Sequence, residues 1–231
     1  GNGIGMTTRT NQSAQTDTRT RLLRTSLAIF AHRDFEAVSV REIVEQAGAN
    51  IAAISYHFGG KQGLYLATAE FLADALHGEL GPTLAQTRAG AENADPVTAS
   101  HLLDEMIQRL VHNLTMDRLG DDAAGFILRE QHQPTPAFDI LYERLMLPIQ
   151  STCQLLVSRI LGDAGPDSRR ETLITHALIG QILAFRTART TVLRRLGQTD
   201  FSQEDAREIA DVISRLTLNA LRSDNKRNSS S

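Results

Sequence analysis

The sequence predicts an all-α protein of about nine helices, because apolar residues recur at intervals of three and four along most of its length. Glycine, proline and N-capping residues separate these periodic segments, as they do between helices. No alternating segment long enough for a β-strand occurs, and no internal repeat is evident. We therefore expect a helix-turn-helix unit near the N-terminus, followed by a larger helical domain.

The composition is that of an ordinary globular protein, with 231 residues, 41% of them hydrophobic and 22% charged. A net charge of −3 means that any affinity for nucleic acid depends on a local patch. It argues against an architectural protein that binds DNA of any sequence. Cys153 is the only cysteine, so no internal disulfide can form. Neither a membrane span nor a signal peptide is recognised, and we expect a cytoplasmic location.

The N-terminal residues divide into a polar leader and a first helix. Residues 1–5 precede a methionine and are interpreted as a cloning scar, and residues 6–16 lack an apolar stripe, which predicts a disordered arm. Asp17 is a suitable N-cap for a helix over residues 18–33. The apolar residues of this helix, including Leu23, Leu27 and Phe30, share one face and are expected to be buried.

Two short helices follow the first. Ser39 and Glu42 form a capping box that opens a helix over residues 40–47, and Gly48 is placed to end it. Two short helices joined by a tight, glycine-containing turn and preceded by a longer helix form a helix-turn-helix unit. We place this unit in residues 17–65.

The second helix of the pair is the expected recognition helix. Asn50 is its N-cap, and the helix covers residues 51–57. Ile54 and Phe58 lie four residues apart and anchor one face to a core. The opposite face carries two alanines, which allow a close approach to a surface, and a tyrosine hydroxyl. A small helix of this kind suits the major groove of DNA.

Residues 66–222 are expected to form the second domain. A helix from Lys61 to about residue 80 is broken or kinked by Gly81 and Pro82. Asp95 and Pro96 open the next helix, and Asp121 opens one that ends near residue 133.

Three helices are predicted to complete the second domain. The first covers residues 137–161 and is kinked or split at Pro148. The others cover residues 169–196 and 201–222. Residues 223–231 form a polar tail, which we expect to be disordered.

Four stretches in residues 18–69 resemble the TetR family of transcriptional repressors. They read LAIFAHRDFEAVSV, REIVEQAG, ISYHF and GGKQGLYLA. The segments NIAAISYHFGGK and REQHQPTPAF, together with the later Pro148, resemble the sequences of a subgroup that has its own C-terminal domain. Many members carry a tyrosine where this chain has Ser55, and a lysine-glycine pair at Ile51 and Ala52. The phosphate contact of that tyrosine then falls to Tyr56 or His57.

The resemblance implies a sequence-specific regulator that is a homodimer on a palindromic operator and responds to a small molecule. Residues expected to face phosphates are Thr18, Ser39, Arg41, Tyr56, His57 and Lys61, with Val40 beside them. Residues expected nearest the base edges are Asn50, Ile51, Ala52, Ala53 and Ser55. Lys61 also stands at a helix N-terminus, which favours an anion such as phosphate.

The last two helices are the expected dimer interface. Gly180, Ala184 and Ala188 are spaced by four, which lets another helix approach closely. Leu216, Leu218 and Leu221 supply apolar surface. The alternative is that these residues pack only within one subunit.

A stripe of methionine and aromatic residues marks the candidate effector pocket, although such a stripe also forms plain core. The candidate ligand-binding residues are Met106, Leu110, Phe126, Gln131, His132, Phe138, Tyr142, Met146, His176 and Phe185.

Metal binding and catalysis receive no support from the sequence. Four histidines (His101, His112, His132 and His176) are scattered without ligand spacing, so neither a metal nor a cofactor is expected. The nucleophile-elbow and phosphate-loop motifs are missing. An all-α small-molecule binding protein or enzyme with an incidental helix-turn-helix remains the alternative, and converging acid, base and nucleophile in one pocket would favour it.

Overall fold

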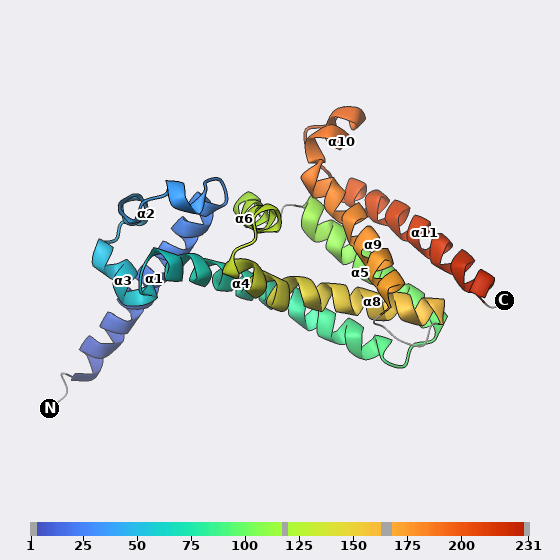
Figure 1. The fold of residues 1–231 in the computed structure, drawn as a ribbon, viewed down its shortest axis with the longest axis horizontal. Coiled ribbons are helices and arrows are strands. Elements are labelled where there is room, and N and C mark those ends of the chain that lie inside the picture. Colours follow the sequence, from blue (N-terminus) through green and yellow to red (C-terminus); the bar gives the residue numbers. More distant parts are fainter. Residues whose placement is uncertain (1–3, 117–119, 163–167, 229–231) are drawn as a thin grey trace. The chain divides into compact units, whose positions relative to one another are not determined.

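The computed structural model describes residues 4–116, 120–162 and 168–228, and the predicted all-α class is confirmed there, since these residues contain no strand. Figure 1 shows the helices. They are α1 (Ile4–Phe30), α2 (Val40–Ala47), α3 (Ile51–Phe58), α4 (Lys61–Ala91), α5 (Pro96–Thr115), α6 (Asp121–His132), α7 (Pro136–Leu141), α8 (Leu147–Leu161), α9 (Arg169–Thr187), α10 (Arg189–Leu196) and α11 (Gln203–Asn228). A 3₁₀ turn covers Phe35–Ala37 and a π turn covers Tyr142–Met146. None of the helices in the described ranges is long and apolar enough to cross a membrane.

The first of two compact units contains the expected helix-turn-helix. It comprises residues 1–78 and 120–145, so it holds α1 to α3, the first part of α4, α6 and α7. Helices α1, α2 and α3 contact one another, as the motif requires. Their fully buried side chains include Leu22, Leu23, Phe30, Ile43 and Ile54. This core holds α3 through Ile54, as its apolar spacing predicts.

Helix α6 packs against α1 within this unit. A Cβ added to Gly125 would lie 2.8 Å from the carbonyl oxygen of Ala31, so only glycine allows the two helices this close. The Arg129 Nε donates to the carbonyl oxygen of Phe30 at 3.1 Å. The ring of Phe126 lies 5.1 Å from that of Tyr65. Because of these contacts, the compact units differ from the division at residue 65 expected from the sequence.

The second compact unit is a helical bundle of residues 79–119 and 146–231. Helix α5 lies between α8 and α11 and also contacts α9 (Figure 1). Leu103, Ile107, Leu156 and Ile160 are among its fully buried side chains. The helical periodicity of these segments therefore did predict their buried faces.

Both terminal segments differ from their prediction. Helix α1 begins at Ile4, so the described part of the expected arm is helical, and α11 continues to Asn228 rather than ending near residue 222. Extending an existing helix needs no new nucleus, and neither segment contains proline. A polar composition predicted disorder but does not prevent this extension. Residues 1–3 and 229–231, where part of a scar and of a disordered tail are expected, lie outside the described residues.

The two predicted helix interruptions have different outcomes. Helix α4 runs through Pro82 to Ala91, so the expected break there is wrong, because proline removes one backbone donor without ending the helix. The split expected at Pro148 is confirmed, and it takes the form of the π turn between α7 and α8.

The single helix expected over residues 169–196 is two, α9 and α10, separated at Ala188. Thr187 Oγ1 donates to the Leu183 carbonyl at 3.1 Å, a bond that bends helices. Arg189 lies 4.7 Å from the ring centroid of Phe201 and pairs with Asp200, which holds α10 in its new direction. Phe201 itself is buried ahead of α11, not inside it as predicted.

Candidate nucleic-acid interface and small-molecule cleft

Helices α2 and α3 begin at the predicted residues, and α3 ends at Phe58, one residue later than predicted. The Ser39 side chain accepts from the Glu42 N–H at 3.2 Å, and that of Asn50 accepts from the Ala53 N–H at 2.9 Å. Gly48 ends α2 with a φ of 61°, a left-handed conformation that favours glycine. The turn between the helices is thus fixed by local hydrogen bonds.

Helix α3 presents one face to its own core and the other to solvent. Ile54 is buried, whereas Ile51 is 51% exposed and Tyr56 is 72% exposed. Ala52 and Ser55 are also exposed, and Ala53 and His57 are half-buried. Exposed large apolar and aromatic side chains on a short capped helix are available to a partner.

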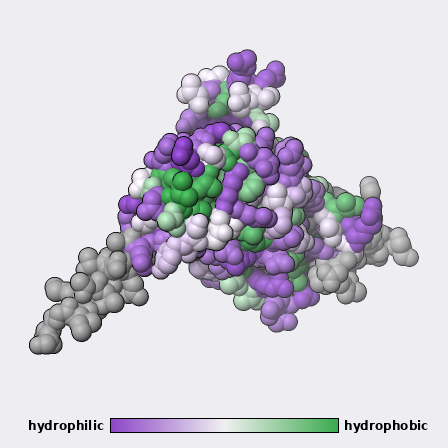
Figure 2. All heavy atoms as spheres, turned by 60° about the vertical axis from the view of Figure 1, so that its left-hand side comes forward, coloured by the Kyte–Doolittle hydropathy of each residue, from purple (hydrophilic) through white to green (hydrophobic). Residues whose placement is uncertain are grey.

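The expected phosphate contacts surround this face unevenly. Ser39 and Arg41 are exposed at the start of α2, and Val40 and Thr18 are half-buried. Figure 2 turns this side of the molecule forward and shows hydrophobic residues gathered among hydrophilic ones. An apolar patch with polar neighbours suits a surface that meets both bases and phosphates.

Lys61 contacts its own chain. Its Nζ donates to the Phe35 carbonyl oxygen and lies 4.2 Å from the ring centroid of Phe35. The sequence indicated a phosphate contact from helix position alone and did not show this partner. Arg19 lies with its guanidinium 5.4 Å from the Phe58 ring centroid. In the sequence Arg19 stands four residues before Leu23, and this spacing does not indicate a contact with Phe58.

The structure separates the candidate ligand-binding residues into two sets. Phe126, Gln131, His132, Phe138 and Tyr142 belong to the first unit. Phe126 is fully buried in the cluster with Phe30 and Tyr65, so it is core. His132 and Gln131 are exposed, with His132 Nδ1 lying 2.7 Å from the Leu128 carbonyl oxygen.

The other five candidates (Met106, Leu110, Met146, His176 and Phe185) belong to the second unit. Met106 and Leu110 line a cleft of about 470 Å³ between α4, α5 and α11. His176 is exposed on α9, and Phe185 packs against the bundle core.

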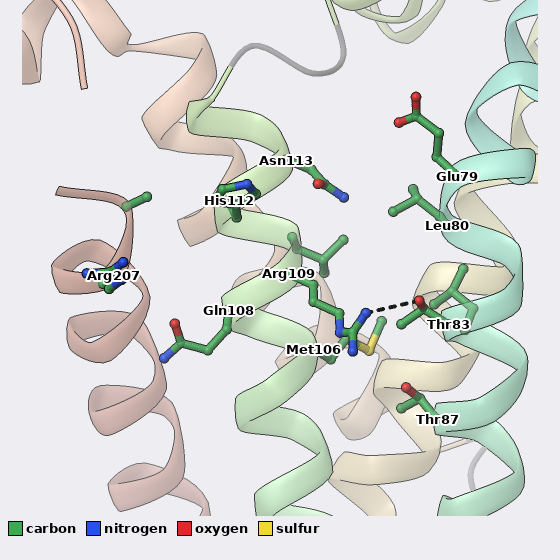
Figure 3. Close-up of a pocket in the computed structure, with 13 residues that line it drawn as sticks. Glu79, Leu80, Thr83, Thr87, Met106, Gln108, Arg109, His112, Asn113 and Arg207 are labelled. Atoms are coloured by element: carbon green, nitrogen blue, oxygen red, sulfur yellow. Dashed lines mark hydrogen bonds between the residues drawn. The ribbon is translucent and has the colours of Figure 1, made fainter. Parts of the chain in front are cut away.

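The cleft also contains polar residues that were not among the predicted ligand-binding residues. Arg109 donates from Nη1 to Thr83 Oγ1 at 3.1 Å, which joins α5 to α4 (Figure 3). Arg109 follows Met106 by three residues, so its helical spacing could have placed it on the same face. Within the described ranges, no group of three or more histidine, cysteine, aspartate or glutamate residues is arranged to hold a metal ion.

Two parts of the chain match known protein families. Residues 22–68 match the bacterial regulatory proteins of the tetR family, and residues 99–222 match the C-terminal domain of the HTH-type transcriptional dual regulator CecR. The CecR protein of Shigella flexneri is 38% identical over 200 residues, which cover 83% of this chain and 86% of that protein. The probable HTH-type transcriptional regulator YttP of Bacillus subtilis is 40% identical over 47 residues, covering 20% of this chain and 23% of that protein.

Solved structures show the same fold. A protein of Mesorhizobium loti assigned to the TetR family has a TM-score of 0.59 at 16% identity and covers 89% of this chain and 97% of its own. A TetR transcriptional regulator of Agrobacterium tumefaciens has a TM-score of 0.55 at 15% identity and covers 88% and 93%, respectively. At these identities the likeness concerns the fold alone.

Proposed function

The chain belongs to the TetR family of transcriptional regulators, with a C-terminal domain of the CecR type, and from this premise we propose a repressor that leaves its operator when a small molecule binds. A DNA-binding regulator needs a surface that recognises a particular DNA sequence. The observation that carries the proposal is α3, which is capped at its start, anchored by Ile54 and exposed on its outer face.

The proposed DNA contacts follow from exposure. Ile51, Ala52 and Ser55 would meet base edges, where an apolar side chain can contact a thymine methyl group. Asn50 and Ala53 lie at the start of the same helix, and the hydrogen bond between them keeps the Asn50 oxygen occupied.

Phosphates are proposed to meet the hydroxyl and charged groups around α3. Tyr56 is 72% exposed, and Ser39 and Arg41 are exposed at the start of α2. His57, Val40 and Thr18 would contribute from their half-buried positions. We propose that Lys61 supports the phosphate contacts only indirectly, because its ammonium group donates to the Phe35 carbonyl oxygen.

We propose that two copies join through α9 and α11. Leu173 and Leu216 are 57% and 60% exposed, and Gly180 has open space around its Cα. Leu221 is buried in the subunit and Leu218 packs against its core, so of the three expected leucines only Leu216 is available. A two-fold dimer would place two recognition helices on half-sites about 34 Å apart, or a multiple of it.

The effector site is proposed to be the cleft lined by Met106 and Leu110. Its volume lies in the range of small-molecule sites, about 300–1,000 Å³. Release from DNA requires that the effector bind more tightly to the state that does not fit the operator.

A single substitution on α3 tests the DNA face. Ala52→Glu places a carboxylate where we expect DNA, and it should lower operator affinity at least about tenfold at fixed salt, because phosphates repel it. The matched control is Ala85→Glu on α4, where Ala85 is also exposed and helical, and this variant should bind normally. Affinity is measured by fluorescence anisotropy on operator and scrambled DNA. Equal affinity of Ala52→Glu and Ala85→Glu for the operator would remove α3 from the interface.

Activation as well as repression is a second candidate, favoured by the similarity to a protein named a dual regulator. A reporter gene distinguishes activation from repression when the operator is placed either upstream of the promoter or inside it. Repression predicts lower expression from the inside position, and activation predicts higher expression from the upstream one.

A further inference from the structure

The cleft in the second unit is formed by two matching helix faces. Leu80, Thr83, Leu84 and Thr87 line it from α4, and Met106, Arg109, Leu110 and Asn113 line it from α5. Each set follows the spacing i, i+3, i+4, i+7, which places its members on one side of a helix. The sides face each other across the cleft, with Ala206 and Arg207 contributed by α11 (Figure 3).

The floor of this cleft is apolar and continuous with the bundle core. Met106 is only 4% exposed, and its sulfur lies 3.7 Å from the sulfur of the buried Cys153. Leu84 and Leu110 are half-buried and pack against the same core. A ligand that covers these side chains would remove apolar surface from water, which favours binding.

Arg109 is the charged group that reaches into the space between the walls. Its guanidinium is drawn beside Met106 and donates to the Thr83 hydroxyl. Among the described residues, no carboxylate forms an ion pair with it. Guanidinium groups have five donors, so most of those on Arg109 remain free for an anion.

The other charged lining residues do not replace it. The Glu79 carboxylate points away from Arg109 in Figure 3. Arg207 already pairs with Glu204 at 3.1 Å, and both side chains are largely exposed. A cation in the cleft would therefore meet the positive charge of Arg109 next to the apolar floor.

We propose that this cleft binds an amphipathic monoanion of the carboxylate class. The carboxylate pairs with Arg109 and accepts from Thr83, and the apolar body lies on Leu84, Met106 and Leu110. This assignment rests on the proposed function only in taking the cleft as the effector site; the binding chemistry itself does not depend on DNA.

The test uses the full chain and two pairs of probes, each a carboxylate and an uncharged alcohol with a similar apolar body. Decanoate is compared with 1-decanol, and 2-naphthoate with 2-naphthol, each by isothermal titration below its aggregation limit. We expect at least one carboxylate to bind at least about tenfold more tightly than its alcohol, since hydrogen bonds to charged groups are the stronger ones. The pair that shows this preference distinguishes an aliphatic from an aromatic ligand.

Variants assign the preference to one residue. Arg109→Gln should abolish the difference between acid and alcohol while leaving alcohol binding unchanged, and Arg109→Lys should keep part of it. Arg88→Gln is the matched control, because Arg88 is exposed on α4 and does not line the cleft, and it should behave as the unaltered protein. The proposal is overturned if neither carboxylate binds, if the alcohols bind as well as the acids, or if Arg109→Gln keeps the preference.

Operator release is measured separately, with the carboxylate that binds. If that carboxylate binds through Arg109 but leaves operator affinity unchanged, the ligand class stands and the cleft is not an effector site for it. If it releases the operator equally from the unaltered protein and Arg109→Gln, the effector response stands and the assignment to Arg109 fails.

Discussion

Glu130 is a buried carboxylate that holds two helices of the first unit together. It has no exposed surface, and burial of an unpaired charge is costly. The Tyr65 hydroxyl donates to Oε1, and the Thr135 N–H donates to Oε2 at 2.9 Å. Burial, and then the bond to Glu130, raise the pKa of the Tyr65 phenol well above its usual value, so it stays a donor. The neighbouring Gln131 and His132 were candidate ligand-binding residues, whereas the contacts of Glu130 serve folding.

Removal of the Tyr65 hydroxyl tests this role. Tyr65→Phe leaves Glu130 without one of its donors, and we expect the free energy of unfolding to fall by about 1–3 kcal/mol. Tyr142→Phe is the control, because Tyr142 is 39% exposed and should change stability by less than about 0.5 kcal/mol. Urea unfolding followed by circular dichroism gives both values. Equal stability of the two variants would contradict the role of the hydroxyl.

Whole helices in this chain begin at side-chain caps. Asp95 opens α5 by accepting from the Thr98 N–H at 2.7 Å, and Asp205 accepts from the Ser202 N–H at the start of α11. The Thr98 backbone hydrogen bond lowers the pKa of Asp95 below its ordinary value of 3.8, and that from Ser202 does the same for Asp205. A folded-state pKa that is depressed stabilises the protein above the unfolded pKa. That stability is lost as the pH falls through the folded value.

Asp95→Asn should therefore change stability most in acid. Asparagine also caps helices, so we expect little change near neutral pH. Below about pH 4 the variant should lose less stability than the unaltered protein, since its cap does not titrate. Thermal unfolding from pH 7 to pH 3 measures this, with Glu105→Gln as a mid-helix control on α5. Parallel pH profiles for the unaltered protein and Asp95→Asn would refute the contribution of the cap.

At the scale of the whole molecule, operator recognition is proposed to need two copies. Leu173 and Leu216 are apolar side chains that remain open in one subunit. A helix with open apolar surface of this kind indicates a protein partner. Association of the two α9–α11 pairs would remove that surface from water.

Leu216→Arg should prevent formation of the proposed dimer, because a buried unpaired charge would oppose association. Operator affinity should then fall, since one recognition helix covers too few bases. Val97→Arg is the control, because Val97 is 66% exposed on α5, outside the proposed interface. Light scattering gives the mass of each variant. A Leu216→Arg protein that remains dimeric and binds its operator would refute the interface.

Much of the fold was predictable because its signals are local. Ser39, Asn50 and Asp95 each cap a helix by a bond to a residue three positions later, so their spacing is visible in the sequence. The buried and exposed faces of α3 also follow from helical spacing. The family resemblance then indicated what such a helix contacts.

The remaining features depend on residues far apart in the chain. Arg129 and Phe30 are 99 positions apart, yet their hydrogen bond joins α6 to α1. The break at Ala188 carries no turn residue, and Arg109 becomes part of a cleft only because α4 lies opposite α5. The sequence by itself determined where most helices begin and which faces they bury, since capping and periodicity act within a few residues. Tertiary packing alone decided which helices meet, and so which side chains share a site.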